Sequence, residues 1–214
     1  MGVPSRFVTE YPKRCLALLD AAEPIAREHD LLTSFALLAA ASVLVIPYER
    51  LKGHHPNKQE RGSALYEALR NLERKPWREA PFWAGGEPGH WQFSRIMGDP
   101  NDVAGWRDEA NRPSTSADAN SIGKRKSGEV LRVLRNALAH GNVVYLNKDG
   151  REAAGTPAHF IAFLSRYEED AAQRDQSETY RLVAVADEHF LAFLRQWALW
   201  LVNFPHDDRL IEAA

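Results

Sequence analysis

The stretch Leu131-Arg132-Val133-Leu134-Arg135-Asn136-Ala137-Leu138-Ala139-His140-Gly141 decides how the middle of this chain folds. At about 100° per residue, its apolar side chains fall on one arc of a helix and its polar side chains on the other. The glycine after His140 suits the left-handed position that follows a helix end. The stretch therefore predicts an amphipathic helix that begins near Asn120 or Ser121 and ends at His140.

The polar arc of this helix carries a candidate reaction centre. Arg132, Asn136 and His140 are spaced four residues apart and form one stripe, with Arg135 beside it. Arginine forks hold phosphate, and an imidazole at a helix C-terminus, where the dipole favours positive charge, can move a proton. These residues predict metal-independent RNA cleavage, with Arg135, Asn136 and His140 catalytic and Arg132 binding substrate. An ordinary solvated helix face is the alternative.

The segment from Arg135 to Gly141 resembles the Arg-x4-His motif of HEPN domains, in a bacterial, often plasmid-encoded branch. An upstream apolar helix ending Ile46-Pro47-Tyr48-Glu49-Arg50 and an aromatic C-terminal helix fit the same branch. The resemblance implies a helical bundle, a homodimer that faces two motifs, and a toxin or phage-defence role with a neutralising antitoxin protein. Glu49 and Arg50 are secondary candidates for orienting Arg or His side chains, with a structural salt bridge as the alternative.

Composition sets bounds on the chain. Its 214 residues are 44% hydrophobic and 26% charged, which is typical of one globular domain, here taken as 1–214. The formal net charge of −2 excludes a strongly basic nucleic-acid-binding protein, so RNA contact requires a local patch. The single Cys15 excludes an internal disulfide and favours the cytoplasm. The adjacent pair His54-His55 has poor metal geometry, and we expect neither a metal nor a cofactor.

Four more helices are expected, at about residues 12–28, 30–46, 63–74 and 187–204. The run from Leu31 to Tyr48 lacks charge over 18 residues, close to the length of a membrane span. Its alanines, hydroxyl side chains and Pro47 favour a core helix buried nearly all round, and we expect no membrane partner.

Residues 75–120 read as a long irregular insertion because prolines and glycines interrupt them. The insertion holds six large aromatic residues: Trp77, Phe82, Trp83, Trp91, Phe93 and Trp106. They could stack on single-stranded bases, but burial within an irregular segment is the favoured interpretation. After it, Lys124, Arg125 and Lys126 fall in the first turns of the motif helix, either contacting RNA phosphates or forming a solvated cluster.

Residues 142–185 predict a small β element with strands at 143–146, 160–164 and 180–185 and a charged loop at 168–178. The expected fold is mainly α, a HEPN-like helical bundle with a small antiparallel β-sheet inserted before the C-terminal helix. The leading function is cleavage of single-stranded RNA by its own 2′-hydroxyl. The alternatives are a non-catalytic module that binds nucleotide, RNA or protein, and an interaction protein that uses the aromatic segment.

Overall fold

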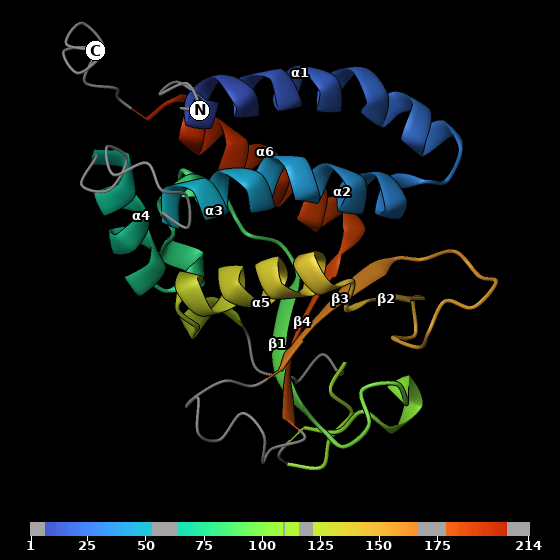
Figure 1. The fold of residues 1–214 in the computed structure, drawn as a ribbon. Coiled ribbons are helices and arrows are strands. Elements are labelled where there is room, and N and C mark those ends of the chain that lie inside the picture. Colours follow the sequence, from blue (N-terminus) through green and yellow to red (C-terminus); the bar gives the residue numbers. More distant parts are fainter. Residues whose placement is uncertain (1–6, 53–63, 109, 116–121, 167–178, 205–214) are drawn as a thin grey trace, which may run out of the picture.

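A computed structural model describes residues 7–52, 64–108, 110–115, 122–166 and 179–204. Helices and a four-stranded sheet share the chain, so the fold is mixed α and β rather than mainly α (Figure 1). The α-helices are α1 (Phe7–Glu28), α2 (Leu32–Ala40), α3 (Ile46–Lys52), α4 (Ala64–Arg74), α5 (Ser127–His140) and α6 (Asp187–Val202). The strands are β1 (Trp91–Met97), β2 (Val143–Leu146), β3 (Phe160–Arg166) and β4 (Thr179–Ala186).

Pro47 does not end the second helix as expected. A π-helical turn, Ala41–Val45, joins α2 to α3, and the Ile46 N–H bonds to the carbonyl of Ala41. Proline cannot donate to the preceding turn, and one wider turn accommodates that lost bond. The helix therefore continues to Lys52 and carries Tyr48 and Glu49 with it.

The sheet is antiparallel, with strand order β1-β4-β3-β2. The predicted strands at 143–146, 160–164 and 180–185 are confirmed with small extensions. The prediction of two or three strands was short by one, because β1 lies within the segment expected to be irregular. Its alternation of Trp91 and Phe93 with polar residues is a strand signal, but neighbouring prolines and glycines concealed it.

Two apolar clusters lie on opposite faces of the sheet. One row of paired residues, Phe93, Val183, Phe163 and Val143, joins the cluster that also contains the helices. The other face packs Ile96, Leu164 and Leu182 around Trp106. Figure 1 shows α5 lying across the sheet, with α1, α2 and α6 beyond it.

The helical run Leu32–Lys52 is long and apolar enough, by length and composition alone, to cross a membrane. In the structure it packs against α1, α5 and α6, as a core helix does. The expectation that it is buried nearly all round is wrong, because Leu38 is 76% exposed while Ala36 and Ala40 are fully buried. One side of the run is therefore open.

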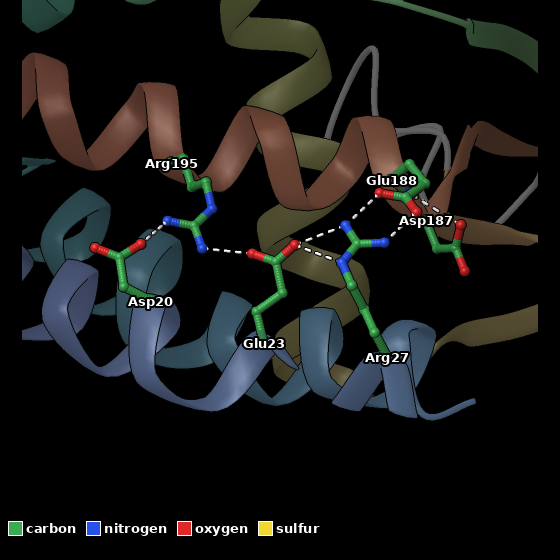
Figure 2. Close-up of polar contacts among 6 residues, drawn as sticks. All are labelled: Asp20, Glu23, Arg27, Asp187, Glu188 and Arg195. Carbon is green, nitrogen blue, oxygen red and sulfur yellow. Dashed lines mark hydrogen bonds and ion pairs between the residues drawn. The ribbon is translucent and has the colours of Figure 1, made fainter. Parts of the chain in front are cut away.

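A chain of alternating charges joins α1 to α6 (Figure 2). We call Asp20, Arg195, Glu23, Arg27 and Glu188 the charge ladder. Arg195 bonds to Asp20 and to Glu23, the latter at 2.5 Å. Arg27 donates to Glu23 at 2.7 Å and to both carboxylate oxygens of Glu188 at 2.5 and 2.7 Å. Every charge in the ladder therefore has an opposite neighbour.

Candidate active site

Helix α5 begins at Ser127, later than the sequence indicated. The Ser127 hydroxyl donates to the carbonyl of Lys75 at 3.0 Å, which ties the helix start to the end of α4. The predicted apolar arc is buried, with Val130, Leu131, Val133, Leu134 and Ala137 at 1% exposure or less. Gly141 adopts φ 71°, so the predicted glycine cap is confirmed. The helix is therefore fixed at both ends.

The Arg135 side chain is held in place by two neighbours. Its Nε donates to the carboxylate of Glu49 on α3, and its Nη1 donates to the Asn136 side-chain oxygen at 2.7 Å. Both members of the ion pair stay partly accessible, at 31% for Arg135 and 30% for Glu49. An acid from another helix thus offsets one arginine of a surface that is acid-free within its own segment.

Asn136 also reaches into the sheet. Its amide nitrogen donates to the Ser165 hydroxyl of β3 at 3.0 Å, and Ser165 is only 5% exposed. The two side-chain bonds of Asn136 therefore connect Arg135 to β3. Sequence reasoning missed Ser165, although a hydroxyl at the end of the apolar run Phe160–Leu164 was a usable signal.

Arg132 and His140 are both exposed, at either end of the stripe that Asn136 centres. His140 is the last residue of α5 and lies two residues before β2 begins. We call Arg132, Arg135, Asn136 and His140 the polar stripe. The structure places all four on α5 as the periodicity predicted.

A buried tyrosine lies close to Arg132. The Tyr48 hydroxyl donates to Glu73 at 2.7 Å, and Lys52 pairs with the same carboxylate oxygen at 2.6 Å. Burial raises the pKa of Tyr48, the Glu73 charge adds to that shift, and Arg132 opposes it. This hydroxyl therefore stays protonated at neutral pH. The motif was not predicted to involve Tyr48, Lys52 or Glu73.

The basic triplet does not lie on α5. Lys124 ends a 3-10 turn, Arg125 follows, and Lys126 is the residue just before the helix. The Arg125 guanidinium lies 4.5 Å from the centre of the Phe93 ring, while Lys124 and Lys126 are exposed. The prediction that the triplet forms the first helical turns is wrong, because Trp77 and Arg125 pair their backbones at 2.7 Å. Of the secondary pair, Glu49 meets Arg135, whereas Arg50 is 6% exposed.

The aromatic segment offers no stacking platform. All six of its large aromatic residues are at 4% exposure or less: Trp77, Phe82, Trp83, Trp91, Phe93 and Trp106. Trp77 lies at the centre of the first cluster, with ring centroids 5.0 Å from Trp91 and 5.3 Å from Phe82. Burial of these rings is confirmed, and a surface built from them is excluded.

Ligating side chains were also considered as a metal centre. Within the described ranges, no group of three or more His, Cys, Asp or Glu residues could hold a metal ion. The adjacent pair His54-His55 and the expected charged loop at 168–178 lie outside those ranges or largely so.

Comparison with known proteins identifies one family. The family model described as HEPN pEK499 p136 matches residues 1–208, which is nearly the whole chain. No curated protein and no solved structure matches.

Proposed function

The chain belongs to the HEPN family, and on that premise we propose that it is an endoribonuclease that cleaves single-stranded RNA without a metal ion. Membership indicates a nuclease or an RNA-binding module. The observation that favours cleavage is the polar stripe, in which Arg135 and Asn136 are positioned by Glu49 and Ser165 beside an exposed His140. Pre-positioned donors are what stabilises developing charge in a transition state.

The reaction begins with the ribose 2′-hydroxyl as the nucleophile. A base removes its proton, the oxygen attacks the adjacent phosphorus, and the bond to the 5′-oxygen of the next nucleotide breaks as an acid donates a proton to it. The products are a 2′,3′-cyclic phosphate and a 5′-hydroxyl. DNA is not cleaved because it has no 2′-hydroxyl.

Each residue has a distinct role in this proposal. Arg135 binds the phosphate oxygens through donors beyond those that Glu49 and Asn136 engage. His140 transfers a proton as base or acid, and Arg132 adds positive potential at the exposed end of the stripe. Glu49 and Ser165 are positioning residues, because they contact Arg135 and Asn136 rather than substrate.

One imidazole cannot serve both as base and as acid in a single step. A symmetric homodimer brings two copies of the motif together, so that His140 of the partner subunit supplies the second proton carrier. This assembly also fits a toxin or defence protein, which an antitoxin would silence by separating or covering the two motifs.

The test is cleavage of a fluorescent single-stranded RNA in EDTA. Wild-type protein should release products with 2′,3′-cyclic phosphate ends, and His140→Ala should lower the rate by about a thousandfold. The matched control is His29→Ala, an exposed histidine beyond the end of α1, which should retain full activity. Equal rates for wild type and His140→Ala, or a strict requirement for magnesium, would refute the proposal.

A non-catalytic module that binds RNA, nucleotide or protein is the second candidate. The contact between Glu49 and Arg135 favours it, because the acid offsets the positive charge on which phosphate binding depends. Binding of an RNA oligonucleotide that Arg135→Gln abolishes, without any turnover, would support this candidate over the first.

A further inference from the structure

A second basic site lies outside the polar stripe, at the edge strand of the sheet. A cavity of about 150 Å³ opens there between β1, the turn at residues 108–112, and Arg125. Three arginines line it, Arg95, Arg112 and Arg125, together with Phe93 and Asp108. Such a concentration of guanidinium groups is unusual in a chain whose net charge is −2.

The groups around the cavity are held in position. Arg125 lies over the Phe93 ring at 4.5 Å, which keeps its planar fork in one orientation. Asp108 accepts the backbone N–H groups of Ala110 and Arg112, both at 2.9 Å, and the Arg112 Nε at 2.8 Å. The only acid in the lining is thus engaged by its own turn, and Arg95 and Arg125 add positive charge to it.

The size of the cavity limits what it can hold. Sites for whole small molecules have volumes of roughly 300–1,000 Å³. A volume of about 150 Å³ suits one compact charged group that is attached to something outside. Paired arginines favour a phosphate or another oxyanion, which accepts several N–H bonds at once.

The cavity is on the same side of the sheet as α5. Phe93, whose ring Arg125 covers, belongs to the apolar cluster beneath that helix. Arg125 lies two residues before α5, and Arg135 lies eight residues beyond its start at Ser127. At about 1.5 Å per residue the helix covers roughly 12 Å between Ser127 and Arg135, a length that a few nucleotides can span.

We propose that this cavity binds a backbone phosphate of the same single-stranded RNA whose scissile linkage lies at Arg135 and His140. The inference rests on the proposed function for the identity of the strand. Phosphate recognition itself does not require a 2′-hydroxyl, so single-stranded DNA should occupy the cavity without being cleaved.

Binding of a fluorescent single-stranded DNA dodecanucleotide tests the cavity independently of cleavage. Arg125→Gln and Arg95→Gln should each weaken binding about tenfold. Each should also reduce the slope of log affinity against log salt by about 0.7, the value for one phosphate contact on a single strand. The matched control Lys148→Gln removes one exposed charge elsewhere and should change neither quantity. Thermal melting establishes that each variant is folded, and Arg95→Gln retains the stacking of Arg125 on Phe93.

Substrate length provides the second measurement. For a dodecanucleotide RNA, the cavity variants should raise KM about tenfold and leave kcat unchanged. For a dinucleotide, which has one internal phosphodiester, they should change neither constant. Unchanged DNA affinity in both variants would overturn the proposal, and so would an equal loss with Lys148→Gln. A chain that binds DNA through the cavity but cleaves no RNA would refute only the proposed function.

Discussion

The charge ladder between α1 and α6 and the polar stripe on α5 use the same side chains for different purposes. In the ladder each arginine lies between carboxylates, and Figure 2 shows the charges alternating along the seam. In the stripe only Arg135 has such a partner, Glu49, and the imidazole of His140 remains exposed. Full pairing holds two helices together, whereas partial pairing leaves a positioned group that can still meet a ligand.

The largest expected effect separates the two regions by activity. Arg135→Gln should lower RNA cleavage about a hundredfold or more, because it removes a donor aimed at transition-state charge. Arg195→Gln removes the same charge from the ladder and should leave the cleavage rate of the folded protein unchanged. Rates at saturating RNA in EDTA measure both, and equal losses would abolish the distinction.

Glu49→Gln sharpens the comparison within the stripe. It should increase RNA affinity, since the carboxylate no longer offsets Arg135, and lower kcat about tenfold, since the guanidinium is no longer held. The opposed changes in KM and kcat are the expected signature of a positioning residue. A loss of thermal stability with no change in either constant would show that the pair is only structural.

The ladder should reveal itself in the pH dependence of stability. Burial acts to raise the pKa of Glu23, but the bonds from Arg195 and Arg27 lower it below its ordinary value of about 4.5. A lowered folded-state pKa stabilises the protein above the unfolded pKa, and that contribution disappears as pH falls through the folded value. Glu23→Gln should therefore cost about 1 kcal/mol near pH 7. Urea unfolding should give a difference that vanishes under strongly acidic conditions, and a difference that persists there would contradict the ion-pair origin.

The smallest effect is expected at Ser165. Ser165→Ala removes the hydroxyl that accepts from Asn136 and leaves a buried amide donor without that partner. Cleavage should fall about threefold and the free energy of unfolding by about 1 kcal/mol. Ser165→Thr keeps the hydroxyl and serves as the control. Loss of activity in both variants would point to packing in β3 rather than to the hydrogen bond.

Local patterns predicted much of this molecule. The apolar arc of α5, its glycine cap, and the strands after it follow from helical and alternating periodicity within short segments. The basic triplet and β1 were misplaced for one shared reason. Trp77 pairs its backbone with Arg125, and β1 pairs with β4, which is more than eighty residues later in the chain. Such partners leave no periodic signal in either segment alone.

By itself, the sequence determined which side of α5 is polar and that Arg132, Arg135, Asn136 and His140 share it, because a helix has a fixed number of residues per turn. Only the tertiary structure decided how those groups are held. Glu49 reaches Arg135 across 86 positions and Ser165 reaches Asn136 across 29, through the packing of α3 and β3 against α5. Contacts of that range depend on how the apolar faces of separate elements meet in one core, which no short stretch of sequence specifies.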